Sequence, residues 1–199
     1  MPRILAFAGS LRKASFNKAL VNVAVVGARQ AGADVTVIDL ADYPMPVLNQ
    51  DEEAENGKPE AVKKLKALMI EHDGFLIACP EYNSSITGAL KNVIDWTSRP
   101  DDGDAPGGLA AYKGKVVALM AASPGALGGL RGLVHVRAIL GNIGCIVLPD
   151  QVAIAKAHEA FKDDGTLSNE RQQASVLALG TTLAETLEKL SCGPAATNT

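Results

Sequence analysis

The fold is decided near the amino terminus, where residues 4–17 read Ile-Leu-Ala-Phe-Ala-Gly-Ser-Leu-Arg-Lys-Ala-Ser-Phe-Asn. The apolar run 4–8 is typical of a strand that is buried on both faces, as in a parallel sheet. A helix is predicted over residues 17–31, because its apolar side chains share one stripe and Gly32 follows it. A strand, a polar loop and a helix in this order predict the first unit of an α/β fold.

The same alternation repeats along the rest of the chain. Further strands are predicted at 35–38, 75–79, 116–122 and 145–148, and further helices at 60–71, 88–98, 130–140 and 169–190. Residues 40–59 are predicted to form a long loop, because they are rich in proline and acidic residues. The repetition predicts one α/β domain over residues 1–191, with a five-stranded parallel sheet, helices on both faces and a disordered tail at 192–199.

The composition of the 199 residues excludes several classes of protein. The chain is 47% hydrophobic with a net charge of -3, which is too apolar for a disordered chain and not basic enough for a nucleic-acid partner. No apolar run has the length of a membrane span or signal peptide, so we expect no membrane insertion. Three cysteines without CxxC spacing predict unpaired thiols in a reducing cytoplasm, and three scattered histidines predict no metal site.

Two charged stretches are predicted to be solvated surface. They are the lysines of the 60–71 helix, Lys63, Lys64 and Lys66, and the acidic loop of Asp101, Asp102 and Asp104. The single tryptophan, Trp96, is predicted to lie in the core.

The loop from Gly9 to Asn17 is the first candidate site. Ligands of open α/β sheets bind beyond the carboxyl ends of the strands, and this loop leads from such an end to a helix N-terminus, which attracts anions. Ser10, Ser15 and Asn17 add neutral donors, and Arg12 adds a planar cation suited to phosphate. The loop matches neither GxxxxGK[ST] nor GxGxxG. We predict a phosphate site, with a simple helix cap by Ser15 or Asn17 as the alternative.

Two further loops follow strands that end at the same edge of the sheet. In the loop from Pro80 to Gly88, backbone amides and Asn83 are suited to the edge of a planar heterocycle, and Tyr82 to part of its face. A plain polar turn that caps the next helix is the alternative. The glycines of the loop 123–129 permit close approach of a ligand, but glycine-rich turns before helices are common.

Together these residues resemble a known family. The pattern Gly9-Ser10-Leu11-Arg12-x-x-Ser15-x-Asn17, followed by Pro80-Glu81-Tyr82-Asn83-x-Ser85-x-x-Gly88-x-Leu90-Lys91-Asn92-x-Ile94-Asp95-Trp96, resembles the NAD(P)H-dependent FMN reductases, which are flavodoxin-like proteins and include quinone, chromate and azo-dye reductases. A distant third match is Gly128-Gly129 followed by Arg131, His135 and Arg137. The resemblance spans about residues 1–190. It implies a doubly wound sheet with strand order 2-1-3-4-5, FMN at the switch point, and a homodimer or homotetramer.

The resemblance implies an FMN site with three parts. The phosphate loop falls on Ser10, Arg12, Ser15, Phe16 and Asn17. The ring loop falls on Pro80, Glu81, Tyr82, Asn83, Ser84 and Ser85, and the third loop on Ser123 and Gly125.

The implied activity is that of an FMN-dependent NAD(P)H:acceptor oxidoreductase. Flavin N5 accepts a hydride from NADH or NADPH, and the electrons pass by a ping-pong mechanism to a quinone, with chromate, ferric complexes, azo compounds or free flavin as further acceptors. Because the flavin carries this chemistry, no side chain is predicted as a catalytic acid or base. Two alternatives remain open at this stage: a non-enzymatic electron carrier like flavodoxin, and a phosphate-binding module without redox function.

Overall fold

The computed structural model describes residues 1–101, 104 and 108–191, so the predicted tail at 192–199 lies outside the described residues. The strands are β1 (Arg3–Ala8), β2 (Asp34–Val37), β3 (Gly74–Ala78), β4 (Glu81–Tyr82), β5 (Ser85–Ile86), β6 (Val116–Ala122) and β7 (Ile146–Ile154). The helices are α1 (Phe16–Gln30), the 3-10 helix η1 (Leu40–Asp42), α2 (Gln50–Asn56), α3 (Glu60–Glu71), α4 (Gly88–Thr97), α5 (Leu130–Asn142), α6 (Ala157–Ala160) and α7 (Glu170–Ser191). None of the described helices is both long and apolar enough to cross a membrane.

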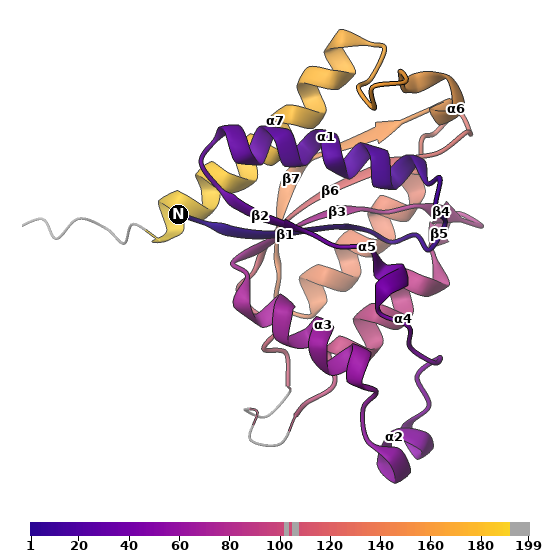
Figure 1. Cartoon of the computed structure of the whole chain (residues 1–199), viewed down its shortest axis with the longest axis vertical. Helices are drawn as coiled ribbons and strands as arrows, with labels where there is room; N and C mark the ends of the chain where they lie inside the picture. Colours follow the sequence, from indigo (N-terminus) through magenta and orange to yellow (C-terminus); the bar gives the residue numbers. More distant parts are fainter. Residues whose placement is uncertain (102–103, 105–107, 192–199) are drawn as a thin grey trace, which may run out of the picture.

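The main sheet is parallel throughout, in the order β2-β1-β3-β6-β7. This order confirms the predicted 2-1-3-4-5 arrangement of a flavodoxin-like sheet. The winding reverses between β1 and β3, and such a reversal opens a crevice at the carboxyl edge of the strands. Helices α1 and α7 cover one face of the sheet, and α3, α4 and α5 cover the other (Figure 1).

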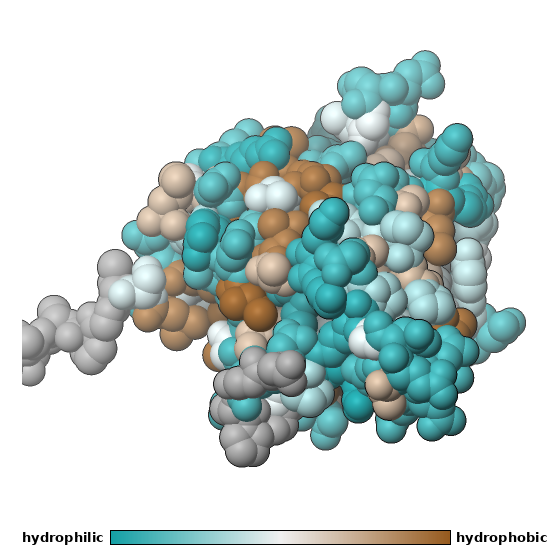
Figure 2. Space-filling view, turned by 60° about the horizontal axis from the view of Figure 1, so that its bottom comes forward, coloured by the Kyte–Doolittle hydropathy of each residue, from teal (hydrophilic) through white to brown (hydrophobic). Residues whose placement is uncertain are grey.

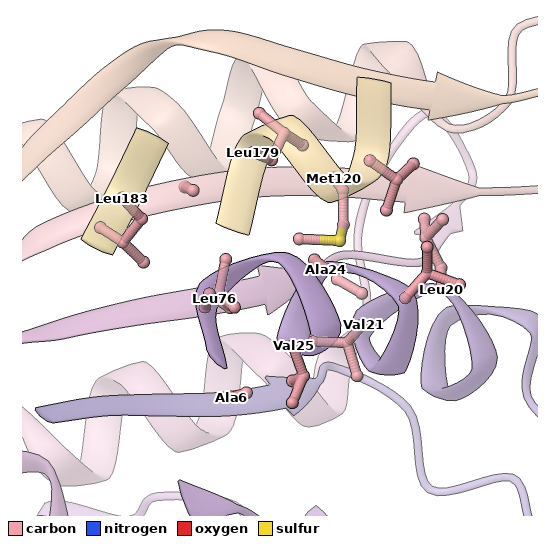
Figure 3. Close-up of a cluster of buried hydrophobic side chains, with 14 of the residues drawn as sticks. Ala6, Leu20, Val21, Ala24, Val25, Leu76, Met120, Leu179 and Leu183 are labelled. Atoms are coloured by element: carbon pink, nitrogen blue, oxygen red, sulfur yellow. The ribbon is translucent and has the colours of Figure 1, made fainter. Parts of the chain in front are cut away.

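Each face of the sheet carries its own apolar layer. Figure 3 shows the layer under α1 and α7, where Leu20, Met120 and Leu179 come together from α1, β6 and α7. The opposite layer contains buried side chains from α3, α4 and α5, and Trp96 is buried as predicted. Burial of both layers fixes the strands and therefore the loops that follow them.

Helices α1 and α7 pack backbone against backbone. A Cβ on Gly27 of α1 would lie 2.0 Å from the carbonyl oxygen of Leu177, and one on Gly180 of α7 would lie 1.9 Å from that of Ala24. Both positions therefore exclude any side chain. This close contact holds α1 rigidly along the sheet, so the position of its N-terminus is also fixed.

The prediction of an unbroken loop over residues 40–59 is wrong, because η1 and α2 form within it. Helix α2 buries none of its side chains, so it lacks the apolar stripe from which helices are predicted. Asn49 caps α2 and three acidic residues lie in its first turn, both of which stabilise a helix N-terminus. Figure 2 shows the mostly hydrophilic surface at this end of the molecule, where α2 projects.

Strand β7 continues to Ile154, well beyond the predicted end at residue 148. Pro149 and Asp150 are typical of a turn, but β7 is an edge strand with a register irregularity opposite Val117 and Leu119, and both features tolerate proline. Arg137 of α5 donates to the side chain of Gln151 (3.0 Å), next to the irregularity. The longer strand brings its carboxyl end to the same edge as those of β1, β3 and β6.

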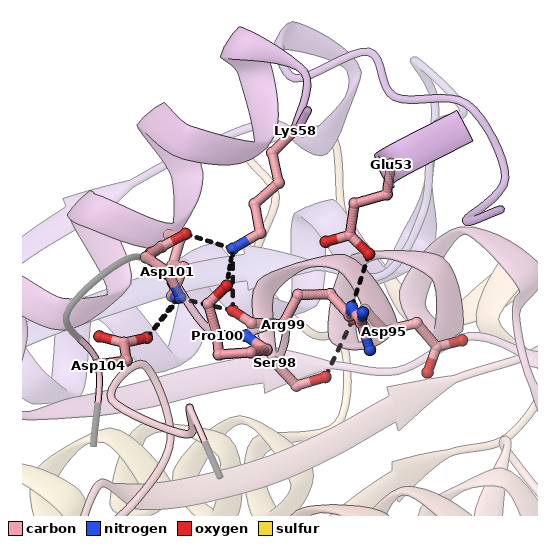
Figure 4. Close-up of polar contacts among 9 residues, drawn as sticks. Glu53, Lys58, Asp95, Ser98, Arg99, Pro100, Asp101 and Asp104 are labelled. Carbon is pink, nitrogen blue, oxygen red and sulfur yellow. Dashed lines mark hydrogen bonds and ion pairs between the residues drawn. The ribbon is translucent and has the colours of Figure 1, made fainter. Parts of the chain in front are cut away.

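The solvated-surface prediction is confirmed for Lys63 and Lys64, which are exposed, but it is wrong for Lys66. In the acidic loop Asp101 is exposed as predicted and Asp104 is half-buried, and both pair with Lys66. Lys66 is 1% exposed, and its ammonium group donates to the carbonyl oxygen of Arg99 (2.7 Å) and to the carboxylates of Asp101 (2.5 Å) and Asp104 (3.1 Å). Lys58 also pairs with Asp101 (Figure 4). We call Lys58, Lys66, Asp101 and Asp104 the lysine–aspartate cluster. Asp102 lies outside the described residues.

The predicted unpaired thiols are confirmed for two of the three cysteines. Cys79 and Cys145 are buried and free. Burial raises the pKa of both thiols, to about 12 for Cys145. Cys192 lies outside the described residues.

Candidate functional site

Side chains tie together the three loops that the sequence singles out. The Asn17 amide donates to the carbonyl oxygen of Ala122 (2.8 Å) and accepts from the Ala122 N–H (2.9 Å), which joins α1 to the end of β6. The Thr87 hydroxyl donates to the carbonyl oxygen of Gly9 (2.7 Å), which joins the loop after β1 to the start of α4. These bonds are buried, so the loops form a fixed frame.

A hollow of about 80 Å³ opens within this frame. Nine of the predicted site residues line it: Ser10, Arg12, Ser15, Phe16, Asn17, Pro80, Glu81, Tyr82 and Ser123. Ala122 and Pro124 complete the lining. Four further predicted residues, Asn83, Ser84, Ser85 and Gly125, do not line the hollow, although each belongs to one of the same loops.

The N-terminus of α1 lacks a side-chain cap, which contradicts the simple helix-cap alternative. Ser15 is the N-cap residue, but its side chain makes no capping hydrogen bond, and the Asn17 amide is engaged by Ala122. Among the residues that the structure describes, the N–H groups of Phe16 and Asn17 have no hydrogen-bond partner. Unpaired N–H groups at a helix N-terminus favour an anion.

The donor set around the hollow fits a phosphate group. The Ser10 and Ser15 hydroxyls and the Arg12 guanidinium lie beside the uncapped helix end. Arg12 donates to the carbonyl oxygen of Ala14 (2.6 Å), and its guanidinium carbon lies 5.9 Å from the centre of the Phe16 ring. These donors gather at the helix end, so a phosphate group fits this part of the hollow.

The ring loop is a hairpin of β4 and β5, in which Glu81 pairs with Ile86 and Tyr82 with Ser85. Its two turn residues, Asn83 (φ 51°) and Ser84 (φ 65°), adopt the left-handed conformation that glycine favours. Two-residue strands and a turn without glycine give no clear sequence signal, so the hairpin was not predicted. Tyr82 is 56% exposed, which leaves its ring free to contact a ligand.

Helix α5 holds both strands of this hairpin. The Glu81 carboxylate accepts from the Arg131 guanidinium (2.6 and 3.0 Å) and from the Gly132 N–H (3.0 Å). A ring nitrogen of His135 lies 2.8 Å from the Ser85 hydroxyl. Burial raises the pKa of Glu81, but the bonds from Arg131 and Gly132 outweigh this effect, so the pKa lies below its ordinary range.

Arg131, Gly132 and His135 were not predicted as site residues. The signal that could have found them is the distant third match of the sequence, which includes Arg131 and His135. The contacts of Arg131 with Glu81 and of His135 with Ser85 join residues that are 50 positions apart, so they depend on the fold.

In the third loop, two glycines serve packing within the protein. Gly128 (φ 62°) and Gly129 (φ 94°) both adopt the left-handed conformation. A Cβ on Gly128 would lie 2.7 Å from the backbone of Ile154, at the end of β7, and a Cβ on Gly129 would lie 2.7 Å from the Cβ of Ala121 in β6. The Ser123 hydroxyl accepts from the Gly125 N–H (3.2 Å). This loop therefore closes one side of the hollow through Ser123 and Pro124.

A doubly wound parallel sheet with a donor-lined hollow at its switch point is the arrangement of flavodoxin-like, nucleotide-binding folds. The model of the NADPH-dependent FMN reductase family matches residues 2–159, and the chain belongs to this family. The match confirms the predicted family, FMN as the cofactor and the class of enzyme, an NAD(P)H-dependent reductase.

Known relatives agree with this assignment. The chain is 35% identical over 186 residues to the NAD(P)H:quinone oxidoreductase of Solanum tuberosum, covering 89% of this chain and 90% of the relative. It is 34% identical over 170 residues to an NAD(P)H-dependent FMN reductase of Pseudomonas aeruginosa, covering 85% and 86%. Among solved structures, FerB, a flavoenzyme NAD(P)H:(acceptor) oxidoreductase from Paracoccus denitrificans, superposes with a TM-score of 0.78 at 29% identity, over 95% of this chain and 98% of FerB.

Proposed function

We propose that the protein is an FMN-dependent NAD(P)H:quinone oxidoreductase whose cofactor phosphate binds at the N-terminus of α1. The observation that carries this proposal is the uncapped first turn of α1, where the N–H groups of Phe16 and Asn17 meet a hollow lined by serine hydroxyls and Arg12. Quinones are supported as acceptors by the names of the relatives in potato and other organisms.

In this proposal the residues of the first loop divide into two roles. The Ser10 and Ser15 hydroxyls, Arg12 and the N–H groups at Phe16 and Asn17 bind the phosphate, as donors to an anion. The Asn17 side chain does not bind the cofactor itself. It holds α1 against the end of β6 through its two bonds to Ala122, and so keeps the donors in place.

The β4–β5 hairpin borders the flavin ring. Pro80, Tyr82, Asn83 and Ser84 belong to this border, with Tyr82 exposed toward a planar ligand and the strained turn presenting its amides. Glu81 and Ser85 act through their bonds to α5 and position the hairpin. In the third loop, Ser123 lines one side of the hollow. Gly125 helps to hold the Ser123 side chain there, because its N–H donates to the Ser123 hydroxyl.

Bound FMN supplies the centre that accepts a hydride from NADH or NADPH and releases electrons to the acceptor. The protein binds and orients it, and the hairpin amides offer fixed dipoles to negative charge that develops on the ring. Two-electron acceptors suit a protein with one redox group, which favours quinones. Chromate, ferric complexes, azo compounds and free flavin are further candidate acceptors, used in turn at one site in a ping-pong mechanism.

An absorption spectrum of the freshly purified protein tests this function. We expect the bands of oxidised flavin, which bleach when NADH or NADPH is added anaerobically and return when a benzoquinone follows. A protein that binds FMN but is not reduced by either nucleotide would instead be an electron carrier. A colourless protein that fails to bind added FMN would contradict the proposal as a whole.

We also propose that residues 1–191 form one domain and that the protein works as a homodimer or homotetramer in the cytoplasm. The single main sheet supports the first statement, and the free thiols Cys79 and Cys145 agree with a reducing compartment. The assembly rests on family resemblance. Light scattering coupled to gel filtration measures it, and a monomer at micromolar concentration would contradict it.

A further inference from the structure

Three side chains stack in a row beside the proposed phosphate site. The Arg12 guanidinium lies over the Phe16 ring at 5.9 Å from its centre. The Phe16 ring is nearly parallel to the ring of Phe161, with 6.2 Å between their centres and 7° between their planes. The row therefore runs from the phosphate loop, across the first residue of α1, to the segment after α6.

Phe161 lies on a well-anchored turn. It pairs with Leu167 in an isolated antiparallel bridge, and the Lys162 N–H donates to the carbonyl oxygen of Thr166 (2.8 Å). Leu167 is 2% exposed, and its N–H donates to the Gln173 side chain of α7 (2.9 Å). In Figure 1 this segment follows α6 at the same end of the molecule as the start of α1.

The turn lies just beyond residue 159, where the match to the family model ends. Phe161, and its contact with Phe16, therefore lie outside the match to the family model. Arg12 itself comes from an exposed loop, and a long exposed side chain samples many rotamers unless contacts restrict it. A cation placed over an aromatic face is attracted to it, and a second parallel ring holds the first ring in place.

We propose that Phe161 is a positioning residue that holds Arg12 at the phosphate site through Phe16, and so strengthens the selectivity of the protein for FMN over riboflavin. This inference rests on the proposed function, because it requires that Arg12 binds the cofactor phosphate. Phe161 does not line the hollow itself and reaches it only through Phe16. Its effect is therefore confined to ligands that carry the phosphate.

The competing explanation is that Phe161 only fills space. Phe16 and Phe161 both pack against the apolar layer under α1 and α7. A purely structural role predicts that truncation loosens the whole site, so that FMN and riboflavin lose affinity together. Riboflavin has the same ring and ribityl chain but no phosphate, so it is the matched probe that separates the two explanations.

The experiment compares dissociation constants of FMN and riboflavin for the apoprotein, by quenching of flavin fluorescence, in five forms. These are the wild type, Arg12→Ala, Phe161→Ala, Phe161→Tyr, and the double variant Arg12→Ala/Phe161→Ala. Phe161→Leu keeps the apolar bulk without the aromatic face, and replaces Phe161→Ala if that variant does not fold. Circular dichroism and the melting temperature check the fold of each form.

We expect Phe161→Ala to weaken FMN binding by up to about fivefold, which is the loss if the Phe16 ring no longer holds Arg12 through their cation–aromatic contact, while riboflavin binding changes less than about twofold. Phe161→Tyr keeps an aromatic face and is expected to retain wild-type selectivity. The double variant is expected to bind FMN no more weakly than Arg12→Ala, because Phe161 acts through Arg12.

Equal losses for FMN and riboflavin in Phe161→Ala would overturn the inference and leave the proposed function intact. Additive losses in the double variant would do the same. If Arg12→Ala itself left FMN binding unchanged, the phosphate site of the proposed function would fail, and the inference with it.

Discussion

The hollow at the carboxyl edge of the sheet and the lysine–aspartate cluster use charged groups in opposite ways. In the cluster, each ammonium group has carboxylate and carbonyl partners, and Lys66 is buried among them. Around the hollow, the Arg12 guanidinium has only the carbonyl oxygen of Ala14 as a hydrogen-bond acceptor within the described residues, and the helix end beside it is uncapped.

This difference indicates that the charges of the cluster stabilise the fold, whereas those around the hollow are available to bind a ligand. A cluster whose charges are mutually satisfied ties α3 to the chain after α4, and Arg99 extends the connection to Glu53 of α2 (2.8 Å; Figure 4). A site with donors and few acceptors attracts an anion from outside. Changes in the cluster should therefore affect folding without cofactor binding, and changes at the hollow should do the reverse.

The largest effect on stability is expected from Lys66→Met. Removing the buried ammonium group takes an ion-pair partner from Asp104 and from Asp101, which keeps only its pair with Lys58, so the free energy of unfolding should fall by about 2 kcal/mol. FMN affinity should stay within about twofold of wild type, because no residue of the cluster lines the hollow. Urea unfolding and fluorescence titration measure the two quantities.

The matched control is Lys63→Met on the same helix. Lys63 is exposed and pairs with Glu60 on the surface, so its loss should change stability by less than about 0.5 kcal/mol. If Lys66→Met proved as stable as Lys63→Met, the structural role of the cluster would be wrong.

A smaller effect is expected from Glu81→Gln, which disturbs the hairpin that borders the hollow. The variant keeps the shape of the side chain but loses its charge-assisted bonds from Arg131, so FMN affinity should fall about fivefold. Arg131→Gln should give the same loss, because both changes break one contact. Titration with FMN measures both variants.

Asp95→Asn serves as the control for Glu81→Gln, because Asp95 forms an exposed pair with Lys91 on α4. It should leave FMN affinity unchanged. A loss in Glu81→Gln far greater than in Arg131→Gln would show that the Glu81 carboxylate touches the cofactor directly, contrary to the positioning role.

The smallest effect is expected in the pH dependence of stability. The pKa of Glu81 is lowered in the folded protein, so its ion pair contributes fully above the ordinary pKa of a glutamate carboxyl and is lost as the pH falls through the lowered pKa. In Arg131→Gln the pKa of Glu81 should return toward its ordinary value, which makes the decline of stability with acid shallower. Urea unfolding at several pH values measures this slope, and equal slopes in the two proteins would contradict the assignment.

The sheet and its order were predictable because buried strands leave a strong apolar signal. The runs at 4–8 and 116–122 are apolar throughout, and the resemblance supplied the order in which they pair. Helix α2 and the second half of β7 were missed, because an exposed helix and an edge strand that contains Pro149 carry no such signal. Lys66 was misplaced because a lysine on a helix is assumed to face water unless its partners, here distant in sequence, are known.

The candidate site was predictable where it consists of consecutive residues. Ser10, Arg12 and Ser15 follow a strand and precede a helix, and this local order alone indicates an anion site. The contacts of Arg131 with Glu81 and of Phe161 with Phe16 join distant segments, so they depend on the packing of α5 and α6 against the sheet. The third sequence match includes Arg131, but neither it nor any other spacing in the sequence shows which residues Arg131 and Phe161 contact.

The central claim is that the uncapped N-terminus of α1 holds the phosphate of FMN. A crystal structure of the protein with bound FMN tests it most directly. We expect the phosphate oxygens within hydrogen-bond distance of the N–H groups of Phe16 and Asn17 and of the Arg12 guanidinium, with the ring along the β4–β5 hairpin. A phosphate bound elsewhere, with those N–H groups left to water, would contradict the account.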